Sequence, residues 1–190
     1  MIFVLVHGIH DTCTKVKPLQ TALEHQGHRC LAPSLTPNNG SKGLEHLAKQ
    51  LRDFINAELP NQEIPIGLVG FSMGGLVSRY YLQELGGHQR VSHFFSIAAP
   101  HHGTIMAYFS TRLGAKQMRP NSLFLQNLQQ SAGCLQTLHC YSFWTPWDLM
   151  ILPASSSVWD RAENIAINSL SHPLLLSSRR LHSAILARSI

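Results

Sequence analysis

The chain has 190 residues, of which 44% are hydrophobic and 13% are charged, enough apolar side chain to bury the core of one domain spanning residues 1–190. The formal net charge is +5, but the basic residues are scattered, which excludes the dense basic patch of a nucleic-acid-binding protein. Such a charge is compatible with an acidic substrate or with peripheral contact with an anionic membrane surface. Composition and charge do not determine the oligomeric state.

The sequence contains no sign of a membrane span or a secretory signal. No apolar stretch approaches the roughly 20 residues that a spanning helix requires, and no basic region precedes the first apolar run. We therefore expect a cytoplasmic protein. The four cysteines lie at wide, irregular spacings without a C-x-x-C pair, so we expect free thiols. A bridge between Cys134 and Cys140 stays open as an alternative.

Strand and helix patterns alternate along the chain, which predicts a mostly parallel sheet of about six strands with helices on both faces. A continuous apolar run over residues 2–6 predicts a first strand that is buried on both sides. A helix is expected over residues 14–26 and a short strand over residues 28–31. The next helix is predicted to be capped by Ser41 and stopped by Pro60, with an apolar stripe at helical spacing. This stripe comprises Leu44, Leu47, Leu51, Phe54 and Ile55.

The second half of the chain continues the alternation. The later strands are predicted over residues 64–69, 91–98, 136–143 and 164–167. The later helices are predicted over residues 76–85, 121–128 and 173–188. No internal repeat or linker-like segment interrupts this order, so the sequence predicts a single α/β domain.

Residues 70–74 read Gly-Phe-Ser-Met-Gly, between a predicted strand and a predicted helix. In a sharp strand-to-helix turn, glycine is needed two positions before and two after the central residue, because a Cβ there would collide with backbone. Ser72 would then project its hydroxyl above the sheet, and the N–H of Met73 would point to where an oxyanion forms. The pentapeptide alone is a loose pattern that also occurs in ordinary connections. Its position favours Ser72 as a nucleophile.

A serine nucleophile needs a base, and the base needs a carboxylate that fixes its tautomer. In open parallel sheets such groups gather beyond the carboxyl ends of the strands. Asp148 follows the strand predicted to end at residue 143, and His172 follows the strand predicted to end at residue 167. The sequence therefore predicts a catalytic triad of Ser72, Asp148 and His172, in that chain order.

Other acids and histidines fit these roles less well. Asp160 precedes the last strand, at the opposite edge of the sheet, and His182 falls inside the last helix. His101 and His102 reach the right edge but precede the acid in the chain. Four histidines are candidate metal ligands, but they lack the close spacing that is usual in a metal site. They are His93, His101, His102 and His139. We predict neither a metal nor a cofactor.

The first predicted strand ends in His7, Gly8 and Ile9. A loop at this place can supply the second backbone N–H of an oxyanion hole, and a glycine lets it approach the substrate closely. We predict Ile9 and Met73 as the two donors, with His7 and Gly8 beside the substrate. The alternative is an ordinary turn in which His7 only bonds to backbone.

The segment after the predicted strand 91–98 is the candidate wall of an acyl-binding site. It leaves little chain for a large lid, which predicts weak interfacial activation and a preference for short to medium acyl chains. The apolar candidates for substrate contact, for which core packing is an equal alternative, are Ile105, Met106, Tyr108 and Phe109.

With these parts assembled, the chain resembles the α/β-hydrolase family over nearly its whole length, and within it the smallest lidless bacterial lipases. The resemblance rests on His7-Gly8, residues 70–75, residues 141–150 and Ser171-His172. Residues 98–104 and 118–125 resemble a second branch, the lipase-like hydrolases related to deacylases of glycosylphosphatidylinositol anchors.

The resemblance implies hydrolysis of a small-molecule or lipid carboxylic ester through an acyl-enzyme. A thioesterase or acyltransferase on the same triad, or a catalytically silent binding protein, are the alternatives. The chain departs from the minimal lipases at His10 and Asp11, since those lipases usually carry a glycine after His-Gly-x.

Overall fold

The computed structural model describes residues 1–61 and 63–189. Within these residues, six parallel strands form one sheet in the order β2-β1-β3-β4-β5-β6. The strands are β1 (Ile2–Val6), β2 (Arg29–Leu31), β3 (Ile66–Phe71), β4 (Val91–Ile97), β5 (His139–Trp144) and β6 (Glu163–Ala166). Because all pairs are parallel, the segments that follow β3, β4, β5 and β6 leave from one edge of the sheet.

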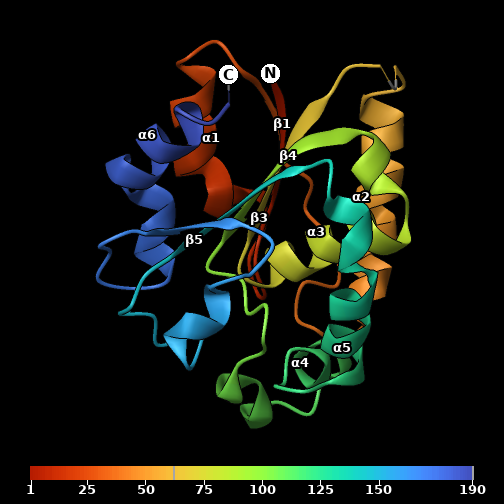
Figure 1. The fold of residues 1–190 in the computed structure, drawn as a ribbon, viewed down its shortest axis with the longest axis vertical. Coiled ribbons are helices and arrows are strands. Elements are labelled where there is room, and N and C mark those ends of the chain that lie inside the picture. Colours follow the sequence, from red (N-terminus) through yellow and green to blue (C-terminus); the bar gives the residue numbers. More distant parts are fainter. Residues whose placement is uncertain (62, 190) are drawn as a thin grey trace.

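Helices cover both faces of this sheet (Figure 1). They are α1 (Lys17–Glu24), α2 (Leu44–Glu58), α3 (Met73–Glu84), α4 (Leu113–Gln117), α5 (Leu123–Gln130) and α6 (Arg179–Leu186). One face is covered by α1 and α6, and the other by α2 and α3, with α5 beyond them. No helix in the described part of the chain is both long enough and apolar enough to cross a bilayer.

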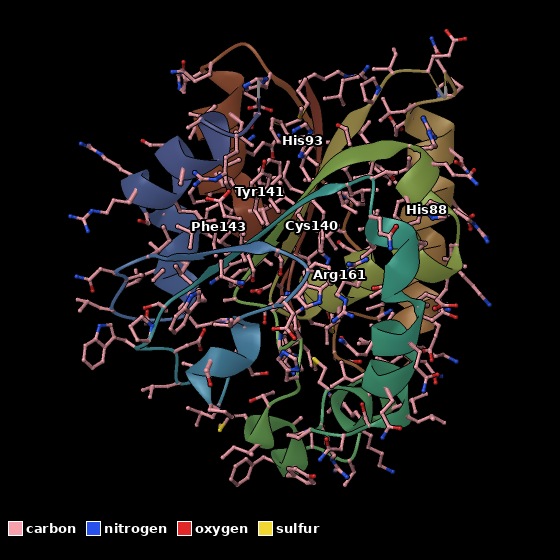
Figure 2. All side chains as sticks on the ribbon, viewed as in Figure 1. His88, His93, Cys140, Tyr141, Phe143 and Arg161 are labelled. Carbon is pink, nitrogen blue, oxygen red and sulfur yellow. The ribbon has the colours of Figure 1, made fainter. Side chains whose placement is uncertain are left out.

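The strand β1 is apolar along its whole length because it contributes to two cores. In β1, Val4 and Val6 belong to the core under α2 and α3, whereas Phe3 and Leu5 belong to the core under α1 and α6. Side chains fill the space on both sides of the sheet (Figure 2). A strand buried on both faces needs a continuous apolar run, which is the pattern of residues 2–6.

The helix predicted to be capped by Ser41 has its N-cap two residues later. Gly43 occupies its N-cap without a side-chain bond, and Ser41 lies in a turn where its N–H donates to Asn39 Oδ1. The first helical N–H, that of Leu44, donates instead to Oε1 of Gln117 at 2.7 Å. A residue 73 positions away therefore supplies the cap that the sequence predicted locally.

The helix predicted over residues 173–188 is two elements. A 3₁₀ helix, η6 (Pro173–Ser177), ends at Ser178, whose backbone is extended. The Oγ of Ser178 then accepts the N–H of Leu181 and caps α6. A similar 3₁₀ turn, η1 (Cys13–Val16), replaces the start of the helix predicted over residues 14–26.

The four cysteines are free thiols, so Cys134 and Cys140 form no bridge.

Candidate active site

The turn between β3 and α3 holds Ser72 in a strained conformation, with φ 54° and ψ −125°. Residues other than glycine rarely adopt this backbone conformation. A Cβ on Gly70 would lie 2.6 Å from the Cα of Gly75, and one on Gly74 would lie 2.5 Å from the carbonyl oxygen of His7. Backbone therefore packs directly against both glycines, as the pentapeptide predicts, and Ser72 sits at the apex of the turn.

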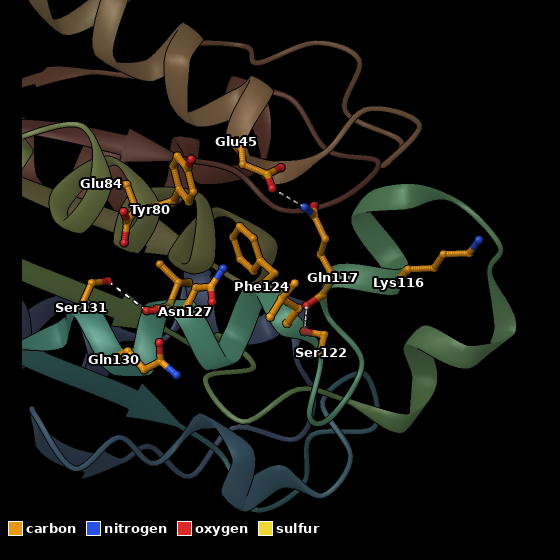
Figure 3. Close-up of a pocket in the computed structure, with 12 residues that line it drawn as sticks. Glu45, Tyr80, Glu84, Lys116, Gln117, Ser122, Phe124, Asn127, Gln130 and Ser131 are labelled. Atoms are coloured by element: carbon orange, nitrogen blue, oxygen red, sulfur yellow. Dashed lines mark hydrogen bonds between the residues drawn. The ribbon is translucent and has the colours of Figure 1, made fainter.

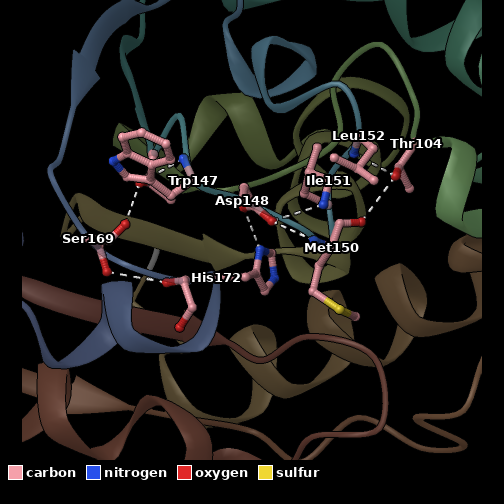
Figure 4. A network of polar contacts seen from close by, with 10 residues as sticks. Thr104, Trp147, Asp148, Met150, Ile151, Leu152, Ser169 and His172 are labelled. Atoms are coloured by element: carbon pink, nitrogen blue, oxygen red, sulfur yellow. Dashed lines mark hydrogen bonds and ion pairs between the residues drawn. The ribbon is translucent and has the colours of Figure 1, made fainter.

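Asp148 and His172 form a buried pair in the segments that follow β5 and β6 (Figure 4). The Nδ1–H of His172 donates to Oδ2 of Asp148 at 2.7 Å, and the side chains are only 7% and 1% exposed. The other carboxylate oxygen accepts the N–H groups of Met150 and Ile151 at 2.8 and 2.9 Å. Since Nδ1 carries the proton, Nε2 of His172 is left with a lone pair and can act as a base.

The imidazole of His172 lies beside the serine turn. Its ring packs on that of Phe71, the residue before Ser72, with 4.8 Å between the centroids. Ser72 Oγ and His172 Nε2 form no hydrogen bond with each other, and such catalytic bonds often tighten only in the complex with substrate. The three predicted side chains thus gather at one edge of the sheet.

Two backbone N–H groups near Ser72 have no acceptor among the described residues. They belong to Met73, the first residue of α3, and to Ile9 in the loop after β1. This loop packs on the serine so closely that a Cβ on Gly8 would lie 3.1 Å from the Cβ of Ser72. The two free donors are those predicted for an oxyanion hole.

The loop after β1 also contains the departure from the minimal lipases. His10 has φ 60°, a left-handed conformation that glycine adopts at no steric cost. Its N–H donates to the carbonyl oxygen of Asn38 at 2.8 Å, which holds the turn in place. The position therefore suits glycine, and in this chain the histidine side chain borders the cavity next to Ser72.

A cavity of about 180 Å³ opens at Ser72. It is smaller than the roughly 300–1,000 Å³ of typical small-molecule sites. Polar groups on its wall come from His10, Thr104 and Ser110. The apolar part of the wall comprises Ile9, Met106, Ala107, Ala115, Met118, Met150 and Ile151. The hollow at Ser72 is thus small and largely apolar.

The structure separates the residues predicted to contact substrate. Met106 lines the cavity, whereas Ile105, Tyr108 and Phe109 lie outside its wall and are exposed. These three residues neither line the predicted wall nor pack in the core.

The structure does not place His7 at the cavity. Its ring is buried, Nε2 accepts the N–H of Leu35 at 2.9 Å, and Nδ1 donates to the carbonyl oxygen of Gly8 at 2.8 Å. Both nitrogens are therefore used in tying the loop after β1 to the segment after β2. Gly8 packs against Ser72 without lining the cavity.

Sequence reasoning missed Thr104, which joins two walls of the cavity. Its Oγ1 donates to the carbonyl oxygen of Met150 at 3.0 Å and accepts the N–H of Leu152 at 2.9 Å. Its position before a helical turn signals a cap, but nothing local signals bonds to residues more than 40 positions away. The sequence also missed α4, which contributes Ala115 to the wall.

The competing acids and histidines lie elsewhere. Asp160 is exposed, and Nε2 of His182 bonds to the carbonyl oxygen of Leu176 at 2.8 Å. His101 is buried, and its Nδ1 accepts from the Arg79 guanidinium at 3.3 Å. Nε2 of His101 then donates to Ser96 Oγ at 2.8 Å. Among the described residues, no group of three or more potential ligands could hold a metal ion.

A larger hollow of about 700 Å³ lies on another part of the surface, between α2, α3 and α5 (Figure 3). Its wall includes Glu45, Tyr80, Glu84 and Lys116. No histidine lines it, and none of the three side chains predicted for the triad does. The smaller hollow at Ser72 is the candidate active site.

This parallel sheet, with a glycine-flanked serine in the turn after β3, defines an α/β-hydrolase and confirms the predicted fold. The chain belongs to the palmitoyl protein thioesterase family, whose model matches residues 2–147. The matched region contains the serine turn and ends one residue before Asp148. No curated protein matched the sequence in a direct search.

Solved structures agree with this fold. A lipase of Bacillus licheniformis in its mature form superposes with a TM-score of 0.80 at 13% identity, over 98% of this chain and 90% of the lipase. Bromoperoxidase from Bacillus anthracis gives 0.68 at 16% identity, over 98% and 90% of the two chains. Lipase B of Aspergillus fumigatus gives 0.77 at 17%, over 92% of this chain and 49% of the lipase. At these identities the likeness concerns the fold alone.

Proposed function

We propose that this protein is a serine hydrolase that cleaves carboxylic esters through an acyl-enzyme at Ser72. The observation that carries the proposal is the buried bond between Asp148 and His172, packed on Phe71 beside the strained serine. Removal of a proton from a serine hydroxyl requires this kind of oriented imidazole.

In the proposed reaction, Nε2 of His172 takes the proton of Ser72 as Oγ attacks the ester carbonyl. The N–H groups of Ile9 and Met73 bind the oxyanion of the tetrahedral intermediate. Asp148 stabilises the imidazolium, which then gives its proton to the leaving alcohol. Water, activated by the same imidazole, releases the acid from the serine.

The proposed substrates carry short to medium acyl chains. The cavity of about 180 Å³ supports this, because its wall is largely apolar and its volume is small. A thioester is the second candidate substrate, and it is favoured by the match of residues 2–147 to the palmitoyl protein thioesterase family. The same three side chains serve both reactions, since only the leaving group differs.

Turnover of p-nitrophenyl butyrate and of butyryl-CoA by wild type and by Ser72→Ala tests the proposal. We expect Ser72→Ala to lose at least about 10³-fold in kcat on whichever substrate wild type cleaves. Ser131→Ala, which removes a hydroxyl far from the cavity, is the matched control and should retain full activity. Equal rates for wild type and Ser72→Ala would contradict the nucleophile assignment.

Three further measurements separate the alternatives. The ratio of kcat/KM on the two substrates distinguishes an esterase from a thioesterase, and added alcohol reveals acyl transfer as a new ester product. A fluorophosphonate probe should label Ser72 in wild type. Wild type without a covalent adduct at this serine would favour a silent binding protein.

A further inference from the structure

Large exposed apolar side chains are concentrated on one part of this molecule. In the described residues, nine of the eleven lie in three short segments, residues 105–113, 147–150 and 170–174, which we call the apolar rim; Ile64 and Leu123 lie outside it. Phe109 is 86% exposed, Leu170 82% and Leu149 74%. Soluble monomers rarely expose a contiguous apolar patch of this kind, and such patches mark interaction sites.

The apolar rim lies at the same edge of the sheet as the candidate active site. Its three segments follow β4, β5 and β6, whose carboxyl ends lie at one edge of the sheet. The first segment also contributes Met106 to the cavity wall, the second contributes Met150, and the third begins two residues before His172. In Figure 1 the green part of the chain, which includes the first segment, extends beyond the sheet at the lower end of the molecule.

The rim is held outward by defined contacts. The Arg119 guanidinium lies 4.7 Å from the ring centroid of Tyr108 and donates to the carbonyl oxygen of Ser110 at 3.0 Å. Thr104 bonds the first segment to the second through the carbonyl oxygen of Met150. Exposure of Tyr108 and its neighbours is therefore part of the folded arrangement.

The exposed charges in the first segment and just after it are basic. The chain carries no acidic residue between Glu84 and Asp148, and Asp148 is buried against His172. Arg112 and Lys116, by contrast, are exposed beside the first segment. Two copies of such a surface would repel each other, whereas an anionic lipid surface would attract it.

We propose that the apolar rim docks on an anionic lipid bilayer, with Phe109, Leu149 and Leu170 entering the boundary between headgroups and acyl chains. Aromatic and aliphatic side chains with flanking basic residues suit this boundary. The proposal rests on the proposed function, because docking would bring an acyl substrate to the mouth of the cavity.

Vesicle co-sedimentation of the full chain tests the docking. Wild type should bind vesicles of phosphatidylcholine and phosphatidylserine more tightly than vesicles of phosphatidylcholine alone. The triple variant Phe109→Ser, Leu149→Ser, Leu170→Ser should lose at least about tenfold in partitioning. The double variant Arg112→Gln, Lys116→Gln should lose the preference for phosphatidylserine.

The matched control is Ile64→Ser, which removes an exposed apolar side chain before β3, at the opposite edge of the sheet. It should bind vesicles as wild type does. Turnover of water-soluble p-nitrophenyl butyrate should stay unchanged in the triple variant, which shows that the variant is folded and separates docking from chemistry.

Absence of vesicle binding by wild type, or equal binding by wild type and the triple variant, would overturn the proposal. A wild-type dimer that the triple variant converts to a monomer, without vesicle binding, would identify the rim as a self-association surface and also overturn it. Vesicle binding by wild type without any ester or thioester turnover would uphold docking and remove the proposed function.

Discussion

The carboxylate of Asp148 is fully occupied by hydrogen bonds. One oxygen accepts two backbone N–H groups, from Met150 and Ile151, and the other accepts Nδ1–H of His172. The backbone donors fix the orientation of the carboxylate, and the carboxylate in turn fixes the tautomer of the imidazole. At the scale of single residues, the direction in which His172 can move a proton is set by two amide groups in the neighbouring loop.

Replacement of Asp148 by asparagine should therefore reduce kcat by about 10³- to 10⁴-fold. The amide oxygen can still accept from the two N–H groups, but the amide NH₂ then faces Nδ1 of His172. Nδ1 becomes the acceptor, so Nε2 carries the proton and cannot remove one from Ser72. Steady-state turnover of p-nitrophenyl butyrate measures the loss.

Asp160→Asn is the control for this substitution, because Asp160 is exposed, and we expect it to retain wild-type kcat. A melting curve should show that the Asp148 variant is folded. Full activity of that variant would mean that another acid orients the base.

At the scale of elements, the serine turn depends on direct contact between β3 and α3. A Cβ added at Gly70 would meet the Cα of Gly75 at 2.6 Å and the carbonyl oxygen of Gly74 at 2.8 Å. Both are backbone atoms, which cannot turn aside as a flexible side chain does. The strand and the helix would have to separate, and the turn that presents Ser72 would change with them.

Gly70→Ala should thus destabilise the protein by about 1–3 kcal/mol and also lower activity. Gly133→Ala is the matched control, since a Cβ at Gly133 has no neighbour within 4 Å among the described residues. The control should change the free energy of unfolding by less than about 0.5 kcal/mol. Urea unfolding measures both, and similar stabilities for the two variants would contradict the role given to Gly70.

The same elements show what the sequence could and could not predict. The strand β1 was predictable because a strand buried on both faces needs a continuous apolar run, and its alternate side chains enter the two cores. The carboxyl-edge positions of Asp148 and His172 followed from where strands end.

What escaped prediction depends on contacts between distant residues. The N–H that begins α2 is capped by Gln117, and α4 contributes Ala115 to the cavity wall. The break at Ser178 also escaped, because an apolar pattern that runs through a cap resembles one long helix. The exposure of Phe109 has the same origin, since hydrophobicity alone predicts burial.

At the scale of the whole molecule, a buried histidine couples folding to pH. Burial, the charge of Arg79 and the neighbouring His102 hold the pKa of His101 well below its ordinary value of 6.5. The ring is neutral because Nδ1 accepts from Arg79. The unfolded chain takes up a proton at this residue below about pH 6.5, whereas the folded chain does not.

Stability should therefore be constant above about pH 7 and should fall as the pH drops below 6.5. The slope for one proton is at most about 1.4 kcal/mol per pH unit. His28 and His93, whose pKa values burial also lowers, add to the same trend from more exposed positions. Urea midpoints at pH 8, 7, 6 and 5 measure the dependence.

His101→Gln should flatten this dependence, because a neutral amide can accept from Arg79 and donate to Ser96 without titrating. His25→Gln, at an exposed ring, is the control and should follow wild type. Parallel curves for wild type and His101→Gln would rule out His101 as the source.

The bond between Leu44 and Gln117 carries a consequence for selectivity. It joins the start of α2 to the segment whose Ala115 and Met118 line the cavity at Ser72. This part of the cavity wall is therefore held in place by a helix that packs on the sheet. If the proposed ester hydrolysis holds, the acyl chain length that the cavity accepts would depend on how α2 packs on the sheet.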